Sequence, residues 1–263
     1  MSDAPDVTAI VCTYNRRARV LRTCEALAQQ DYPGRRYEVI VVDNASTDDT
    51  REAIPRFAAQ APVPFHYLYE GQAGKTHALN AAIAVARGRF LAFVDDDCAP
   101  RPDWLRTLLA PFADDPSLGA VCGPVYSRFP EEVERSAEQR FLAHRFLGDF
   151  TLGEARRELQ GRESPLGCNL ATPTDLTRQI GGYSVRFGPA PGRLGLYEDT
   201  EFIQRNVSFS TSFASTSSFC CASPCTLMFP CAPSTPSNPA FCDFDIITFD
   251  ASPMRRSRFE KMP

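Results

Sequence analysis

Residues 90–98 read Phe-Leu-Ala-Phe-Val-Asp-Asp-Asp-Cys, an apolar run that leads directly into three carboxylates. The apolar half, Phe90–Val94, is typical of a strand buried in a sheet. Unpaired charges are too costly to bury, so the chain is expected to reach the surface at Asp95. In open α/β sheets, ligands bind at the carboxyl ends of the strands. The spacing of Asp95 and Asp97 offers hard oxygen ligands, which suit Mg²⁺ or Mn²⁺ holding a phosphate.

Three further apolar stretches of strand length precede this one. They lie at Val7–Cys12, Glu38–Val42 and Phe65–Tyr69, and segments with helical spacing of their apolar residues connect them. Alternation of strands and helices predicts parallel strands joined by right-handed crossovers. We therefore expect an α/β fold with a Rossmann-like, mostly parallel central sheet flanked by helices.

Polar residues follow three of the predicted strands. Thr13–Arg16, Asp43 and Asp95–Asp97 stand directly after the first, second and fourth strands. Because parallel strands end at the same edge of a sheet, these clusters are expected to lie close together. The chain has neither the Gly-x-Gly-x-x-Gly of a dinucleotide site nor the Gly-x-x-x-x-Gly-Lys-Ser/Thr of a P-loop. Both of those sites are therefore disfavoured.

Helix signals occupy the stretches between the strands. Ser46, with Asp49 three residues later, is typical of a helix start, and Ser46 is the expected N-cap. Another helix is expected from Asp103, with Trp104 as a packing anchor rather than a sugar-binding platform. Later elements are predicted at Gly119–Val125 (strand) and Glu131–Leu147 (amphipathic helix).

Charge and hydropathy exclude several classes of protein. The 263 residues carry a net charge of −4, so no basic field favours nucleic acid. The first residues do not read as a secretory signal, and no apolar run approaches the ~18 residues of a spanning helix. Five of the ten cysteines are scattered singly before residue 205, as reduced buried thiols would be. We expect a cytoplasmic protein without a nucleic-acid partner, and leave open peripheral contact with the inner face of the membrane.

The sequence changes character after Arg205. Residues 206–242 contain no Lys, Arg, Asp or Glu and are rich in Ser, Thr, Pro, Cys and Phe without a regular period. Three interpretations stay open: a shifted reading frame or sequence artefact, a natural low-complexity tail, and a metal or disulfide module. We therefore predict one domain over residues 1–205 and a disordered or aberrant tail over residues 206–263.

Four motifs stand in order along the N-terminal part of the chain, at 10–16 (IVCTYNR), 41–48 (VVDNASTD), 74–80 (GKTHALN) and 93–97 (FVDDD). Together with later stretches at 167–171, 180–183 and 198–202, they resemble the family 2 nucleotide-sugar glycosyltransferases of the GT-A fold. Any one motif alone would be weak, but four in this order are specific. The resemblance covers about residues 7–205 and implies a nucleotide-binding part at 7–98 and an acceptor-side part at 99–205.

The resemblance assigns the acidic loop to the sugar donor and its metal. Asp95 is implied to lie near the ribose and the metal, and Asp97 to be the more direct ligand of Mn²⁺ or Mg²⁺. Asp96 is expected to point away or to brace the loop. A divalent cation there would neutralise the charge that grows on a diphosphate leaving group.

Nucleotide-binding roles follow from the other motifs. Asp43 is implied to accept a hydrogen bond from the base, with an Asx-turn as the alternative. Lys75, at a helix start, would reach the phosphates or support the acidic loop, and is otherwise a surface lysine. The first loop is implied to contact base and ribose, or else to serve turn formation and capping. Its residues are Thr13, Tyr14, Asn15 and Arg16.

The acceptor side rests on an acidic pair that opens a short helix ending at Arg205. By resemblance Asp199 is the general base, with Glu198 second. The alternative is that both acids complement the helix dipole. Two departures concern this side: Tyr197 stands where the family usually has glycine, and Thr172–Pro173 stands where an arginine is common.

The resemblance thus implies an inverting, metal-dependent glycosyltransferase of cell-envelope polysaccharide or glycolipid synthesis. Its donor would be a UDP-, GDP- or dTDP-sugar, and its acceptor a glycan or glycolipid hydroxyl. One alternative is a donor-binding homologue impaired in catalysis by the altered tail. A further alternative is a sugar-phosphate nucleotidyltransferase, although that class favours a glycine-rich first loop with basic residues.

Overall fold

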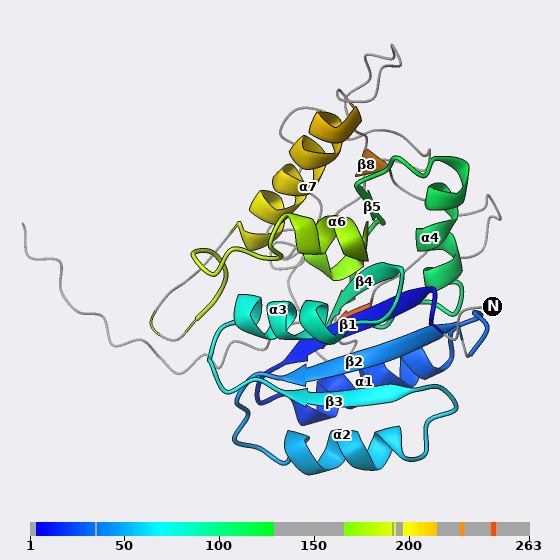
Figure 1. Ribbon diagram of the computed structural model, residues 1–263. Coiled ribbons are helices and arrows are strands. Elements are labelled where there is room, and N and C mark those ends of the chain that lie inside the picture. The colour runs from blue at the N-terminus through cyan, green and yellow to red at the C-terminus, as the bar shows by residue number, and fades with distance from the viewer. Residues whose placement is uncertain are drawn as a thin grey trace, which may run out of the picture.

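The computed structural model describes most of the first 128 residues and the segments that carry the later motifs (Figure 1). The described residues are 4–34, 36–128, 166–190, 192, 197–214, 227–228 and 243–245. The helix predicted at Glu131–Leu147 therefore lies outside them. Within the described ranges, no helix is long and apolar enough to cross a membrane.

A seven-stranded sheet forms the centre of the fold, in the order β3-β2-β1-β4-β7-β5-β8. The first four strands pair in parallel, whereas β7 is antiparallel to both its neighbours. The predicted α/β fold with a mostly parallel sheet is thus confirmed. The strands are β1 (Val7–Thr13), β2 (Tyr37–Asp43), β3 (Phe65–Tyr69), β4 (Phe90–Asp95), β5 (Ala120–Cys122), β7 (Leu170–Pro173) and β8 (Leu227–Met228). A separate parallel pair joins β6 (Tyr126–Arg128) and β9 (Asp243–Asp245).

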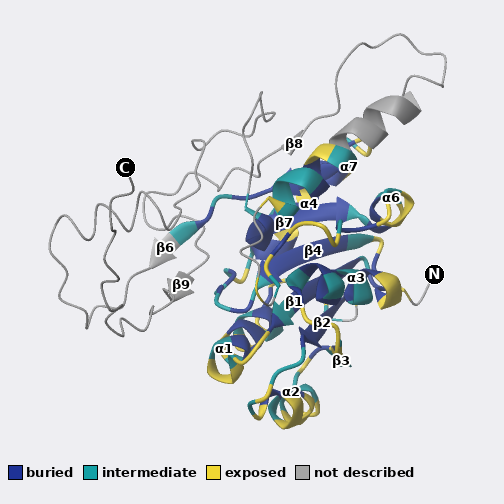
Figure 2. Cartoon of the chain, turned by 90° about the vertical axis from the view of Figure 1, so that its left-hand side faces the viewer, coloured by how far each residue is buried: buried dark blue, intermediate teal, exposed yellow. Residues whose placement is uncertain are grey.

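Helices cover both faces of the sheet, and their exposed residues lie on the outward sides (Figure 2). One core cluster joins the sheet to α1, α2 and α4, and the other joins it to α3 and α7. The helices are α1 (Arg17–Ala28), α2 (Thr50–Ala58), α3 (Lys75–Val85), α4 (Trp104–Asp114), α6 (Thr174–Gln179) and α7 (Glu198–Ala214), with the short 3₁₀ helix η1 at Gly167–Asn169.

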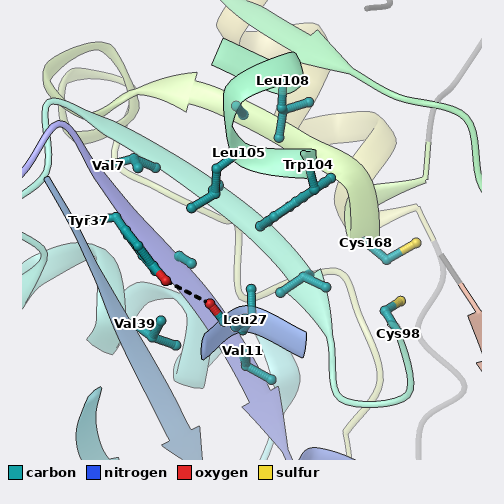
Figure 3. Packing of buried hydrophobic residues seen from close by; sticks show 14 of the residues in the cluster. Val7, Val11, Leu27, Tyr37, Val39, Cys98, Trp104, Leu105, Leu108 and Cys168 are labelled. Atoms are coloured by element: carbon teal, nitrogen blue, oxygen red, sulfur yellow. Dashed lines mark hydrogen bonds between the residues drawn. The ribbon is translucent and has the colours of Figure 1, made fainter. Parts of the chain in front are cut away.

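The strand β4 shows why its sequence is apolar without alternation. Ala92 and Val94 face the first core cluster, whereas Leu91 and Phe93 face the second. A strand covered on both faces buries every side chain, and each large one contributes about 1.5–3 kcal/mol. The first cluster is drawn in Figure 3, where the Tyr37 hydroxyl donates to a backbone carbonyl of α1, 3.0 Å away.

Strand register brings the predicted polar clusters to one edge. Cys12 of β1 lies opposite Asp95 of β4, and Thr13 lies opposite Asp43 of β2. The backbone N–H of Asn44 also donates to the Thr13 carbonyl, at 2.9 Å. The carboxyl ends of β1, β2 and β4 therefore form a common platform, as predicted.

Three predicted boundaries were wrong. Ser46 does not cap α2, which begins at Thr50, because its hydroxyl accepts the backbone N–H of Asn15 instead, at 2.9 Å. The helix α7 does not end at Arg205 but continues to Ala214, since residues 206–214 contain neither proline nor glycine to stop it. The strand predicted at Gly119–Val125 is shorter, because β5 covers only Ala120–Cys122.

Candidate active site

The acidic loop after β4 is braced by its middle carboxylate. The Thr13 hydroxyl donates to one oxygen of Asp96 at 2.7 Å, and the Arg16 guanidinium donates to the other at 2.9 Å. The Asp96 side chain is buried, whereas 35% of the Asp95 side chain is exposed. The predicted bracing role of Asp96 is therefore what the geometry gives. Thr13 and Arg16 serve this brace in the structure.

Negative charge is crowded at Asp97. Its carboxylate lies 3.3 Å from Arg16 and 3.8 Å from Arg19. Burial, followed by repulsion from Asp95 and Asp96, raises the Asp97 pKa to about 6 despite these arginines. Burial thus makes the ionised form of Asp97 costly, and a bound cation would favour it.

Lys75 connects this loop to the acceptor side. Its ammonium lies 2.9 Å from Asp95 Oδ1, at the first residue of α3. Burial disfavours the lysine charge, but the carboxylates of Asp95, Asp199 and Glu198 raise the Lys75 pKa well above its ordinary value. The ammonium therefore pairs with the predicted donor-side Asp95 and is influenced electrostatically by the predicted acceptor-side acids.

Asp199 lies in the first turn of α7, and Glu198 is the first residue of that helix. The backbone N–H of Gly167 donates to Asp199 Oδ2 at 3.1 Å. Burial raises the Asp199 pKa to about 6, against the opposing influence of Lys75. A carboxylate with that pKa is ionised at neutral pH and remains basic enough to accept a proton.

Aromatic packing fixes the helix that carries Asp199. Phe202 is fully buried and stacks on Tyr183, with ring centroids 3.9 Å apart, and both rings meet Phe93 of β4 edge to face. Arg205 donates to the carbonyls of Ile180 and Gly182, each at 2.7 Å. These contacts place the start of α7 above the carboxyl end of β4.

Asp43 is fully buried at the end of β2 and already carries two hydrogen bonds. One oxygen accepts the backbone N–H of Ser46 and the other accepts the Tyr67 hydroxyl, both at 2.8 Å. The bond from Ser46 N–H forms the Asx-turn that is the alternative role expected for Asp43. Each carboxylate oxygen retains a further lone pair, but the residue exposes no surface to solvent in this structure.

Asn44 is a residue whose role the sequence analysis missed. Its amide nitrogen donates to the carbonyl of Gln72 at 2.8 Å, and its amide oxygen accepts the N–H of Gly74 at 2.7 Å. Gly74 has φ +137° and directly precedes Lys75, so Asn44 fixes the start of α3. An amide side chain at a strand end next to Asp43 was the available signal.

The first loop divides into a structural and an exposed part. Asn15, at φ +54°, accepts the N–H of Thr47 at 2.6 Å and so ties the first loop to the second. Tyr14 contacts the solvent, with 56% of the residue exposed. The side chains of Thr13, Asn15 and Arg16 are hydrogen-bonded to neighbouring loops. The exposed Tyr14 ring takes no part in those bonds.

Two aromatic residues flank the acceptor side. Trp104 is buried and donates its indole N–H to the Asn169 side-chain oxygen at 2.8 Å, which fits the packing role. Tyr197 is 70% exposed at φ +73°, a left-handed backbone that favours glycine. The departure noted in the sequence therefore coincides with a strained backbone directly before Glu198.

Asp95 and Asp97 suit a divalent cation as a partial ligand set. No group of three or more His, Cys, Asp or Glu side chains within the described ranges forms a complete metal cage. Mg²⁺ is commonly held by one or two carboxylates together with substrate phosphates. The raised pKa of Asp97 and the partly exposed Asp95 carboxylate fit such a site.

Known proteins share both sequence and fold with this chain. Glycosyltransferase AglE of Haloferax volcanii is 27% identical over 215 residues, covering 81% of this chain and 66% of that protein. Succinoglycan biosynthesis protein ExoM of Rhizobium meliloti is 31% identical over 193 residues, covering 73% of this chain and 58% of that protein. The chain thus spans about two thirds or less of the length of these relatives.

A mannosyltransferase from Pyrobaculum calidifontis, solved with GDP-Man and Mn²⁺, superposes with a TM-score of 0.62 at 23% identity. The superposition covers 94% of this chain and 59% of that one, and it supports the GT-A fold. The model of the family named Glycosyl transferase family 2 matches residues 8–180. With more than half of its residues matched and the acidic loop, Lys75 and Asp199 assembled at one sheet edge, this chain belongs to glycosyl transferase family 2.

Proposed function

We propose that the protein is an inverting, metal-dependent glycosyltransferase that moves a sugar from a nucleoside-diphosphate sugar to an acceptor hydroxyl. The observation that carries the proposal is the convergence on Lys75. Its ammonium contacts Asp95 of the acidic loop, and the charges of Asp199 and Glu198 also stabilise the protonated lysine. A donor clamp and a general base therefore share one small site.

On the donor side, Asp95 and Asp97 would hold Mn²⁺ or Mg²⁺ together with the diphosphate. The bound cation would neutralise the charge that develops on the leaving nucleotide. Asp96 keeps the loop in place through Thr13 and Arg16. The structural neighbour solved with GDP-Man and Mn²⁺ supports this class of donor and metal.

Nucleotide contacts are assigned to the platform formed by the first two loops. Asp43 would accept the base N–H on a free lone pair, and the exposed ring of Tyr14 would pack against the base. Asn15 and Arg16 would support the ribose side, and Lys75 would move from Asp95 toward the phosphates once a cation occupies the loop.

On the acceptor side, Asp199 would remove the proton of the attacking hydroxyl, with Glu198 as the second acid. A single displacement requires the base and the leaving group to lie on opposite sides of the sugar, and inversion of the anomeric carbon follows. Partial burial of Asp199 supports this role because it raises the pKa toward neutrality.

We assign the acceptor to the glycans or glycolipids of the cell envelope and the protein to the cytoplasm, with peripheral contact at the inner face of the membrane. ExoM, named for succinoglycan biosynthesis, supports this class. We retain the division into a nucleotide part (7–98), an acceptor part (99–205) and a tail (206–263).

One observation favours the second candidate, a donor-binding homologue with impaired turnover. The side chain of Asn206 is fully buried at the start of the tail, and its amide oxygen has no hydrogen-bond partner within the described ranges. A buried unpaired polar atom costs about 1–3 kcal/mol, so packing is imperfect where the sequence changes character.

Calorimetric titration with UDP, GDP and dTDP, each with and without Mn²⁺, tests the donor site. We expect metal-dependent binding of one nucleotide, loss of it in Asp97→Ala, and no change in Asp31→Ala, an exposed aspartate in the same chain. Equal affinity with and without Mn²⁺ would overturn the site assignment.

Release of nucleotide from the matching sugar donor, with and without candidate acceptors, then separates the two candidate functions. Transfer supports the enzyme. Metal-dependent binding without any release of nucleotide favours the impaired homologue.

A further inference from the structure

The turn η1 meets Asp199 in an unusually close way. The backbone N–H of Gly167 donates to Asp199 Oδ2 at 3.1 Å. A Cβ atom at Gly167 would lie only 2.1 Å from Asp199 Oδ1 and 2.3 Å from its Cγ. Any side chain at residue 167 would therefore displace the carboxylate, and only glycine leaves it room.

The turn is held by a buried amide. Asn169 is 5% exposed and accepts the Trp104 indole N–H at 2.8 Å, while its own amide nitrogen donates to the Pro124 carbonyl at 2.8 Å. The Gly123 N–H donates to the Asn169 carbonyl at 3.0 Å. These bonds tie η1 to α4 and to the end of β5, so the Gly167 donor has a fixed direction.

The same turn borders the acidic loop. Cys168 lies beside Cys98 in Figure 3. Cys98 directly follows Asp97, and its carbonyl accepts the Thr23 hydroxyl at 2.8 Å. One turn therefore touches the segment that would hold the metal and the carboxylate that would act as base.

We propose that η1 is the positioning element of the general base: Gly167 supplies a backbone donor and the open space for Asp199, and Asn169 with Trp104 fixes that turn. The inference rests on the proposed role of Asp199. Gly167 and Trp104 are positioning residues, which orient the base without touching the substrate. Catalytic groups have to be held within about 0.5 Å of their productive position, and a rigid donor of this kind serves that requirement.

The test compares Gly167→Ala and Trp104→Phe with Gly71→Ala, in which the new methyl group meets only an ordinary 3.4 Å contact. For Gly167→Ala we expect a loss of about 100-fold in kcat, as for a misplacement of about 1 Å. Trp104→Phe keeps an aromatic ring but removes the N–H, and we expect a loss of about tenfold. Gly71→Ala should match the wild type, and all variants should bind GDP or UDP with Mn²⁺ within about twofold of it.

The pH profile distinguishes positioning from a general loss of structure. Removing the Gly167 N–H bond disfavours the ionised form of Asp199, so the midpoint of the pH–rate curve should rise in Gly167→Ala. An unchanged kcat and an unchanged midpoint would overturn the proposal. If Gly167→Ala also loses nucleotide binding, the kcat of Trp104→Phe becomes the test of the proposal. An unchanged kcat in Trp104→Phe would overturn it.

Failure of the proposed function has a different signature. In that case the wild type itself transfers no sugar. The carboxyl ¹³C NMR titration of Asp199, assigned with Asp199→Asn, then still tests the turn. A higher Asp199 pKa in Gly167→Ala than in the wild type supports the positioning role, and equal values overturn it.

Discussion

Buried carboxylates occupy both edges of the central sheet, and they differ in how well they are compensated. At the amino edge, Glu38 of β2 accepts the Thr8 hydroxyl at 2.8 Å and the backbone N–H and Nε of Arg87 at 2.9 Å each. Burial opposes its charge, but these bonds lower the Glu38 pKa below its ordinary value. At the carboxyl edge, burial and then repulsion from neighbouring carboxylates raise the pKa values of Asp97 and Asp199 to about 6.

Backbone strain follows the same division. Within the described ranges, the non-glycine residues with positive φ are Asn15, Ala45 and Tyr197. The first two lie in loops after β1 and β2, and the third directly precedes Glu198 at the start of α7. The amino edge is therefore built for stability, whereas the carboxyl edge keeps carboxylates with raised pKa values and a strained backbone, as functional sites do.

The largest effect is expected from Asp199→Asn, which removes the base but keeps its shape. We expect kcat to fall by about 10³-fold, within the range contributed by general bases. Mn²⁺-dependent nucleotide affinity should stay unchanged, because Asp97 is intact. Steady-state kinetics measure the change in kcat. The control is Asp175→Asn, a substitution on the exposed surface of α6. A variant that retained wild-type kcat would show that Asp199 is not the base.

The pH dependence of the reaction sharpens the assignment. A base must be unprotonated, so kcat should rise about tenfold per pH unit below the Asp199 pKa of about 6 and level off above it. Rates measured from pH 4.5 to 8 with saturating Mn²⁺ and donor give the curve. A rate that declines from pH 5 to 7 would contradict the role of Asp199.

At the amino edge, we expect substitution of Glu38 to reduce stability without reducing nucleotide binding. Glu38→Gln should lower the free energy of unfolding by about 2 kcal/mol at pH 7, because it weakens charge-assisted hydrogen bonds to Arg87 and Thr8. The exposed Arg87 side chain can be rehydrated, which keeps the loss at this level. The difference should shrink as the pH falls below 4.5, where the unfolded-chain carboxylate becomes protonated, and should be lost below the lowered pKa of the folded carboxylate.

Urea unfolding at pH 7 and at pH 4 measures this difference. Glu52→Gln, an exposed substitution in α2, is the control. A reduced nucleotide affinity in a folded Glu38→Gln variant would break the division between the two edges.

At the carboxyl edge, we expect removal of a carboxylate charge to stabilise the protein. Asp97→Asn should raise the free energy of unfolding by about 1–3 kcal/mol at pH 7, since the folded carboxylate has a raised pKa and is ionised at a cost. The gain should vanish near pH 4, where the wild-type carboxyl is protonated in the folded state and partly so in the unfolded one. The same variant should lose Mn²⁺-dependent nucleotide binding. A destabilised Asp97→Asn at pH 7 would show that Arg16 and Arg19 fully compensate the loop.

The smallest effect concerns strain. Ala45 has φ +63°, which costs a non-glycine residue about 1 kcal/mol, and the greater freedom of unfolded glycine offsets part of the gain. Ala45→Gly should therefore stabilise the protein by about 0.5 kcal/mol. Thermal unfolding measures it, with Ala113→Gly in α4 as a control that should destabilise, because α4 is helical there.

Much of this architecture could be predicted from short segments. The apolar runs of β1, β2 and β4 fix buried strands, and strand–helix alternation fixes their parallel order. The same patterns place Asp43 and the acidic loop at one edge. Local signals failed where a distant group competed, as at Ser46, whose hydroxyl binds Asn15 rather than capping α2. They also failed at the end of α7, where composition suggested a break that the backbone does not make.

By itself, the sequence determined the strands, the edge at which they end, and the carboxylates placed there, because each depends on neighbours in the chain. Only the tertiary structure decided which carboxylate braces the loop, that Lys75 pairs with Asp95 within the field of Asp199, and that the Gly167 N–H donates to Asp199. Thr13 and Asp96 are 83 residues apart, and Gly167 and Asp199 are 32 apart. Such pairs are set by how the layers pack, and no local pattern encodes that.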